Sequence, residues 1–234
     1  MIFSILSEGK GWVAIDKPPG LPVIPGRDEE SGPNVRGLLE SQYGQRLFVV
    51  HRLDRDTSGV LLFALDEETH RELSLGFATG DVKKRYDALV KGRVETAKTV
   101  STRLKKTRGG KMKTAAEGED GKPSKTRVRP LEVFREATLL ECEPLTGRTH
   151  QIRVHLADSG NPLLYDHQYG RKEPITENEL GGDEPKVVLA RTPLHAKSAE
   201  FTVAKKKFKV VAPMPADMAR ALVLLRSVGR HGAQ

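Results

Sequence analysis

Short apolar runs separated by polar stretches dominate the chain, and helical periodicity is confined to a few segments. Runs with the length and residue types of β-strands occupy residues 12–15, 47–50, 59–65, 83–92, 187–190, 199–203 and 208–212. Helices are predicted over residues 34–44 and 66–80, because each segment opens on a capping Asn or Asp and closes on Gly. A last helix is expected to begin at Pro215, with residues 229–234 as a frayed tail. The pattern permits an α+β fold.

The segment 144–160 does not show which element it forms. Ile152 and Leu156 are four residues apart, as on one face of a helix that would end at Gly160. Ile152, Val154 and Leu156 also alternate with polar residues, as in a strand. Both interpretations stay open from periodicity alone.

Between residues 93 and 130 the chain becomes strongly basic. From residue 103 to 129 its cations are Arg103, Lys105, Lys106, Arg108, Lys111, Lys113, Lys122, Lys125, Arg127 and Arg129, and the acids in the same range are Glu117, Glu119 and Asp120. The glycines at 109, 110, 118 and 121 argue against a continuous helix or strand. We therefore expect a flexible basic hairpin or loop that contacts phosphate, with a merely solvated loop as the alternative.

A polar stretch at residues 51–59 lies between two apolar runs and is the strongest candidate for chemistry. It combines two acids, two arginines and a histidine with the turn residues Thr57, Ser58 and Gly59. A turn held between two strands could present Asp54 in basic surroundings, which would keep its carboxylate ionised and available as a nucleophile. The alternative is a charged surface loop.

Composition narrows the class of protein. The chain has 234 residues and a formal net charge of +8, which favours an anionic partner such as nucleic acid. A single cysteine, Cys142, excludes an intramolecular disulfide and a cysteine-based zinc cluster, and its apolar surroundings predict a buried thiol. No apolar run approaches the roughly 20 residues of a membrane span, and the start is too quickly polar for a secretory signal. We expect a cytoplasmic protein.

Five motifs together resemble the RluA-type family of pseudouridine synthases. The stretch His-Arg-Leu-Asp-x-x-Thr-Ser-Gly at 51–59 resembles the family signature, and Asp-Lys-Pro-Pro-Gly-Leu-Pro-Val at 16–23 its opening motif. The others are Lys-x-Tyr-x-Ala-Leu-Val-x-Gly at 84–92, Gly-Arg-Thr-His-Gln-Ile-Arg-Val-His-Leu at 147–156 and Arg-x-x-Leu-His-Ala at 191–196. The resemblance covers residues 12–218, nearly the whole chain.

The resemblance implies an α+β catalytic domain over residues 1–228, with a mixed, largely antiparallel central sheet and flanking helices. It implies conversion of uridine to pseudouridine in ribosomal or transfer RNA, without cofactor or metal, by a protein that we expect to be a monomer. Many relatives carry an S4-type RNA-binding domain in front, whereas here only about ten residues precede the first predicted strand. RNA affinity is therefore expected from the catalytic domain itself.

The resemblance also assigns the catalytic roles. Asp54 corresponds to the family's nucleophile, and Arg153 to the helix arginine that pairs with it, with Arg148 as the alternative. Tyr86 corresponds to the tyrosine that stacks against the target base and assists removal of the C5 proton.

Further residues are expected to bind the substrate. Leu194 would pack beside the active site, and Arg52 would fill the space left when the target nucleotide is flipped out. Arg148 and His150, beside a glycine turn, suit an anion-binding helix start. His150 and His155 are five residues apart and would not share a helix face, so a metal site is not expected there. The competing class is an RNA-binding protein without catalysis.

Overall fold

The computed structural model describes residues 3–26 and 32–231. Most of the polar loop expected between residues 25 and 33 lies outside these ranges. The chain forms two compact units. Unit 1 comprises Met1–Lys84 and His195–Pro213, and unit 2 comprises Arg85–Leu194 and Met214–Gln234.

Unit 1 is built on a mixed sheet. Its strands are β1 (Ser4–Gly9), β2 (Trp12–Lys17), β3 (Phe48–Val49), β4 (Ser58–Ala64), β12 (Leu194–Val203) and β13 (Lys206–Val211). β2 lies between β1 and β4, β12 follows β4, and β3 and β13 pair with β4 and β12. The pairings are antiparallel except that β12 runs parallel to β4. All seven residues of β4 are buried, as the uninterrupted apolar run predicts.

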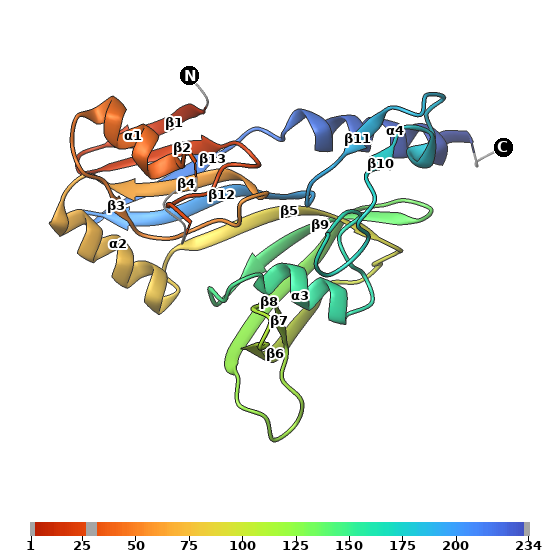
Figure 1. The fold of residues 1–234 in the computed structure, drawn as a ribbon, viewed down its shortest axis with the longest axis horizontal. Coiled ribbons are helices and arrows are strands. Elements are labelled where there is room, and N and C mark those ends of the chain that lie inside the picture. The colour runs from red at the N-terminus through yellow and green to blue at the C-terminus, as the bar shows by residue number, and fades with distance from the viewer. Residues whose placement is uncertain (1–2, 27–31, 232–234) are drawn as a thin grey trace. The chain divides into compact units, whose positions relative to one another are not determined.

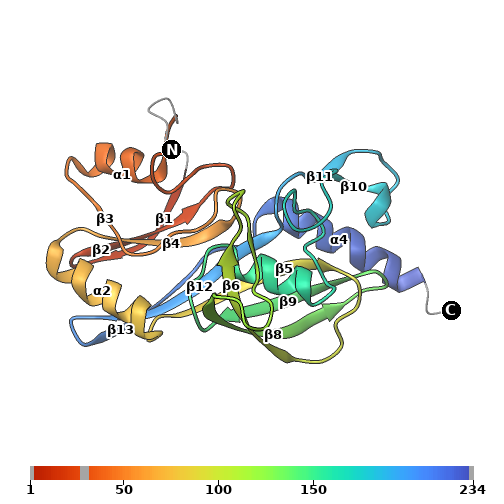
Figure 2. The same ribbon diagram turned by 60° about the horizontal axis from the view of Figure 1, so that its bottom comes forward.

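The two helices of unit 1 begin and end where the sequence predicts. Helix α1 (Val35–Tyr43) is capped by Asn34 and ends at Gly44, and α2 (Glu67–Thr79) is capped by Asp66 and ends at Gly80. Each cap side chain accepts a hydrogen bond from a backbone N–H of the first turn, and each terminal glycine is left-handed. Figure 2 shows α1 above and α2 below the strands β2 and β4.

The core of unit 1 lies between its sheet and α2. Leu73 of α2 packs in a cluster with Trp12, Leu62 and Phe201. The indole of Trp12 meets the rings of Phe201 and Phe208 edge-on, with each pair of centroids 4.9 Å apart. This packing fixes the strands on either side of the 51–59 stretch.

Unit 2 contains an antiparallel sheet with a helix against it. Its strands follow the order β5 (Lys83–Lys91), β9 (Ala137–Pro144), β8 (Lys122–Val133), β6 (Lys98–Lys106) and β7 (Met112–Thr114). The segment that periodicity left ambiguous is the helix α3 (Gln151–Asp158), which contacts β6, β7, β8 and β9. Figure 1 shows α3 against these strands, and the loop that follows β7 extends beyond it.

The expectation of no continuous strand between residues 93 and 130 is wrong, although the hairpin is confirmed. β8 has 12 residues and β6 has nine, paired from Lys98–Val128 to Leu104–Lys122. The glycines lie outside the paired strands, in turns such as Thr107–Gly110. We call β6, β7, β8 and their connections the basic hairpin (residues 98–133).

The remaining elements of unit 2 pack around α4 (Ala216–His231). They are β10 (Ile175–Thr176), the 3-10 helix η1 (Asn178–Leu180) and β11 (Val187–Leu189). α4 continues past Val228, so the tail predicted to fray from residue 229 is helical up to His231. Val228 lies against Gly181, where a Cβ would clash with it, so α4 is still packed at the residue before that tail. The predicted α+β class, with mixed, largely antiparallel strands and flanking helices, is confirmed.

Candidate active site

The turn that carries Asp54 is fixed by its neighbour in unit 1, the 17–21 turn. The backbone N–H of Gly20 donates to the carbonyl oxygen of Arg55 at 2.9 Å, and Nε of Arg55 donates back to the carbonyl oxygen of Gly20 at 2.9 Å. Within the turn, the N–H of Thr57 donates to the carbonyl oxygen of Asp54 at 3.2 Å. The backbone carbonyls of Asp54 and Arg55 are therefore both held by hydrogen bonds.

A buried lysine holds these two turns together. Lys17 is 0% exposed, and its Nζ donates to the carbonyl oxygens of Pro18, Leu21 and Arg55 at 2.7, 2.8 and 2.8 Å. A buried ammonium is stabilised only where hydrogen bonds replace its hydration, and these carbonyls supply them. Pro18 supplies a carbonyl oxygen to Lys17 and has no backbone N–H that would itself need an acceptor. Lys17 thus connects the opening motif to the Asp54 turn.

The first and last residues of the 51–59 stretch anchor it to the sheet and to α2. Nε2 of His51 accepts from the N–H of Leu62 at 3.0 Å, and its ring stacks on Phe77 with centroids 4.4 Å apart. Burial, together with the charge of Lys84, lowers the pKa of His51 to about 3, so the ring is neutral at pH 7. The neutral, stacked ring of His51 therefore has a structural role. At the other end of the stretch, Gly59 has φ +106°, and a Cβ there would clash with the backbone of Ala196.

Arg153 is buried in unit 2 and paired with Asp166. Its Nε and Nη2 donate to the two carboxylate oxygens of Asp166 at 2.7 and 2.8 Å, with the side chains 4% and 1% exposed. Burial alone would raise the pKa of Asp166, but Arg153 and the backbone N–H groups of Gln168 and Tyr169 hold it below its ordinary value. The pair fixes the plane of the guanidinium group.

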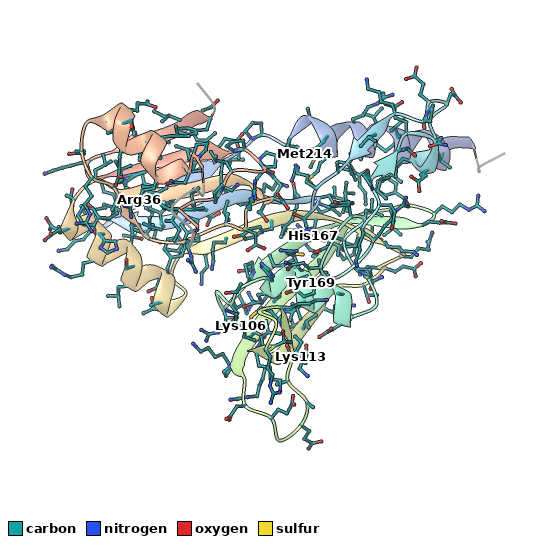
Figure 3. All side chains as sticks on the ribbon, in the orientation of Figure 1. Arg36, Lys106, Lys113, His167, Tyr169 and Met214 are labelled. Carbon is teal, nitrogen blue, oxygen red and sulfur yellow. The ribbon has the colours of Figure 1, made fainter. Side chains whose placement is uncertain are left out.

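Tyr169 joins Arg153 to the basic hairpin. Its ring lies under the guanidinium, with the Cζ atom of Arg153 5.1 Å from the ring centroid. Its hydroxyl oxygen accepts from the backbone N–H of Met112 in β7 at 3.0 Å and lies 2.9 Å from Nδ1 of His150. Nζ of Lys111 lies 4.8 Å from the same ring. Figure 3 shows Tyr169 near Lys106 and Lys113 of the hairpin.

Gln151 explains why α3 begins where it does. Its Oε1 accepts from the hydroxyl of Thr146 and the N–H of Arg148, and its Nε2 donates to the carbonyl oxygen of Lys125 at 3.0 Å. The preceding residue, His150, is left-handed with φ 52°. The start of α3 is therefore fixed against β8, which places Arg153 in the first turn of the helix.

A hydroxyl network holds the other end of α3. Nε2 of His155 lies 3.0 Å from Oγ1 of Thr102 and 2.9 Å from Oγ of Ser124, and Nδ1 lies 2.9 Å from Oγ1 of Thr126. Burial lowers the pKa of His155, which favours the neutral ring.

Among residues 3–26 and 32–231, no three histidine, cysteine or acidic side chains come together as metal ligands would.

The other predicted site residues are divided between the units. Asp54 and Arg52 belong to unit 1, where Arg52 is exposed. Tyr86 and Leu194 are buried side chains of unit 2, at 9% and 4% exposure. The structure brings Arg153 and His150 together around Tyr169.

Two further predictions concern Arg148 and Cys142. The exposed Arg148 donates through Nε to the carbonyl oxygen of Pro123 at 3.1 Å. The thiol of Cys142 is buried as predicted, and burial raises its pKa.

In the described part of the chain, no helix is both long and apolar enough to cross a bilayer.

Residues 11–158 match the family model described as RNA pseudouridylate synthase. The chain belongs to this family. The family assignment confirms the resemblance that the motifs of the sequence predict. The match spans the Asp54 turn, β5 with Tyr86, the basic hairpin and α3 with Arg153.

Curated members of the family are similar along nearly the whole chain. It is 37% identical over 230 residues to the ribosomal large subunit pseudouridine synthase D of Nitrosomonas europaea, covering 96% of this chain and 65% of that protein. It is 35% identical over 226 residues to the ribosomal large subunit pseudouridine synthase C of Vibrio cholerae, covering 95% and 69%. The chain thus spans about two thirds of the length of these relatives.

Two solved structures share the fold. Human RNA Pseudouridylate Synthase Domain Containing 4 is 27% identical with a TM-score of 0.74, covering 95% of this chain and 93% of that one. Human RNA Pseudouridylate Synthase Domain Containing 1, 24% identical with a TM-score of 0.73 over 90% of this chain and 83% of that one, supports the fold alone.

Three residues of this region were not predicted from the sequence. Lys17 lies in the opening motif, and the signal that could have revealed it is its place just after the apolar run 12–15, at the end of a buried strand. Asp166 and Tyr169 lie in an apolar and aromatic stretch, where an isolated acid indicates a buried partner. Their contacts to Arg153 come from the fold, which the sequence order does not reveal.

Proposed function

We propose that this chain is an RNA pseudouridine synthase that isomerises uridines of large-subunit ribosomal RNA. The family and the names of the curated relatives support the reaction and favour ribosomal over transfer RNA. The structural observation that carries the proposal is the fixed turn at Asp54, whose carboxylate lies on a backbone held by Lys17 and Gly20. A carboxylate on a preorganised turn suits a nucleophile or base, because little reorganisation precedes the reaction.

The reaction breaks the bond from C1′ to N1, turns the uracil and rejoins C1′ to C5, with loss of the C5 proton and protonation of N1. No atom is gained or lost, so neither a redox cofactor nor a second substrate is required. Asp54 acts on the ribose, either by adding to C1′ or by removing a ribose proton. The target nucleotide is first flipped out of its stack, at a cost of a few kcal/mol.

We assign Arg153 to hold Asp54 ionised and Tyr86 to stack on the released uracil. The pair with Asp166 fixes the plane of the Arg153 guanidinium through Nε and Nη2. Tyr86 assists removal of the C5 proton, and Leu194 packs beside the base. Arg52 occupies the space vacated by the flipped nucleotide. Asp54 and its partners belong to different units, so these roles rest on the family motifs and on the local geometry of each residue.

The basic hairpin is proposed to contact the RNA backbone. Lys106, Arg108 and Lys113 are exposed, whereas Lys105 is paired with Glu119 at 2.6 Å. Exposed cations on a hairpin attract phosphates and add no sequence preference of their own.

Mapping of pseudouridines in ribosomal RNA tests the function directly. Cells with and without the gene for this chain are compared at every uridine of the large-subunit RNA. The proposal expects at least one pseudouridine to disappear without the chain and to return when the wild-type chain is restored. Identical maps would exclude ribosomal RNA as the substrate, and the same comparison on transfer RNA would then decide between the two substrates.

A further inference from the structure

A hollow on unit 1 lies between α2 and β3, apart from the Asp54 turn. It has a volume of about 480 Å³ and is lined by Arg46, Phe48, Glu67, His70, Arg71 and Ser74. Ligand sites in proteins typically have volumes of roughly 300–1,000 Å³. The hollow is thus large enough for one nucleotide, and all its lining residues belong to one unit.

Two arginines and one glutamate line this hollow. Within residues 3–26 and 32–231, neither Arg46 nor Arg71 forms an ion pair, and both are exposed. Ten other arginines in the same ranges do have carboxylate partners, namely Arg36, Arg85, Arg93, Arg127, Arg129, Arg153, Arg171, Arg191, Arg220 and Arg226. Two guanidinium groups that line one hollow repel each other and attract an anion. Their chemistry suits a phosphate group, which arginine binds through two parallel hydrogen bonds.

Two aromatic rings also line this hollow. The rings of Phe48 and His70 are stacked, with centroids 5.2 Å apart and an angle of 28° between the planes. The guanidinium carbon of Arg46 lies 5.5 Å from the centroid of Phe48. Nucleobases stack on such aromatic and guanidinium planes irrespective of base identity.

We propose that this hollow binds one nucleotide of the RNA substrate other than the uridine that reacts. Arg46 and Arg71 bind its phosphate, and its base stacks against Phe48 and His70. The carboxylate of Glu67 accepts a hydrogen bond from a ribose hydroxyl, a group that DNA lacks at C2′. This inference rests on the proposed function, because it takes the RNA substrate as the ligand.

The test compares two double variants that remove the same charge. Arg46→Gln/Arg71→Gln neutralises the hollow, and the control Arg36→Gln/Arg135→Gln neutralises two arginines outside it. The dissociation constant for a large-subunit ribosomal RNA transcript that the wild type modifies is measured at several salt concentrations. Turnover is measured at saturating RNA.

The hollow variant is expected to bind about tenfold more weakly at low salt, with a slope of log affinity against log salt smaller by about 0.7, because one phosphate is no longer neutralised. The control should stay within about twofold of wild type in affinity. Turnover at saturating RNA should stay unchanged in both, because the hollow takes no part in the reaction. Equal affinities and slopes for the two double variants would overturn the proposal.

A further variant separates stacking from charge. Phe48→Leu removes the ring and keeps an apolar side chain, so it should weaken binding about fivefold without changing the salt slope. Since Phe48 also packs against the core of unit 1, thermal unfolding is recorded alongside. Unchanged affinity in Phe48→Leu would overturn the stacking assignment.

Failure of the wild type to modify any ribosomal RNA would instead contradict the proposed function. The same titrations with single-stranded oligouridylate would then still test the hollow.

Discussion

The ammonium group of Lys17 and the carbonyl oxygen of Arg55 are joined by a buried hydrogen bond of 2.8 Å across 38 residues of sequence. Arg55 directly follows Asp54, so the contact fixes the backbone beside the proposed nucleophile. The same lysine donates to two carbonyls of its own turn. The opening motif of the sequence and its central motif are therefore one structural assembly within unit 1.

The substitution Lys17→Met should destabilise the protein and abolish turnover. Methionine has a similar length but removes three hydrogen bonds, and of these acceptors the Arg55 carbonyl keeps the N–H of Gly20, so the free energy of unfolding should fall by about 2–4 kcal/mol. Urea denaturation measures this, with the exposed Lys10→Met as control, for which we expect a change within about 0.5 kcal/mol. Equal stability of the two variants would show that Lys17 does not hold the turn.

Asp166→Asn should destabilise unit 2, because it replaces a buried carboxylate that accepts two charge-assisted hydrogen bonds from Arg153. Removal of one partner of a buried ion pair typically costs about 3–5 kcal/mol of unfolding free energy. The pKa of Asp166 is lowered in the folded protein, so its contribution is complete above the ordinary aspartate pKa of about 4 and is lost as the pH falls toward the lowered value.

Denaturation from pH 7 down to pH 2 checks both expectations. The wild type should lose stability more steeply than Asp166→Asn below about pH 4, since the variant has already lost the group that titrates. Parallel curves for the two proteins would show that Asp166 does not contribute to the acid dependence.

Tyr169→Phe should loosen the basic hairpin and leave the ring under Arg153. The variant loses the hydrogen bonds of the hydroxyl to Met112 and His150, which should cost about 1–2 kcal/mol. Hydrogen exchange at the Met112 amide should accelerate, while that of unit 1 should not change. Tyr165→Phe is the matched control. Unaltered exchange at Met112 would contradict the assigned contact.

Local signals in the sequence predict part of the fold. Asn34, Asp66, Gly44 and Gly80 end their helices through contacts within a few residues, so the bounds of α1 and α2 could be predicted. The identity of α3 could not, because Gln151 fixes its start by hydrogen bonds to β8, 25 residues away or more.

The strands of the basic hairpin were not expected for a related reason. On β8, Ser124, Thr126 and Val128 point inward and the intervening cations point outward. The alternation is therefore present, but two of its three buried positions, Ser124 and Thr126, carry hydroxyls in place of apolar side chains. These hydroxyls are satisfied by His155, a partner that the sequence pattern does not reveal.

Neutralising the basic hairpin should weaken RNA binding without changing turnover at saturating RNA. Lys106→Gln/Arg108→Gln/Lys113→Gln removes three exposed cations, and each lost phosphate contact should reduce the salt slope by about 0.7. Titrations of a ribosomal RNA transcript at several salt concentrations give the slope. The control replaces three exposed lysines elsewhere, namely Lys10, Lys172 and Lys186. Identical slopes for the two triple variants would mean that the hairpin is merely solvated.

The rate of pseudouridine formation by Asp54→Asn tests the central claim most directly. Asparagine keeps the shape of the side chain and removes its charge, and Asp56→Asn makes the same change two residues away. Both are measured in single turnover on a large-subunit ribosomal RNA transcript, with RNA binding recorded in parallel. The account predicts that Asp54→Asn binds RNA normally and is slower by a factor of about 10²–10⁴ or more, whereas Asp56→Asn stays near wild type. A rate for Asp54→Asn within about tenfold of wild type, equivalent to less than about 1.4 kcal/mol of activation free energy, would contradict it.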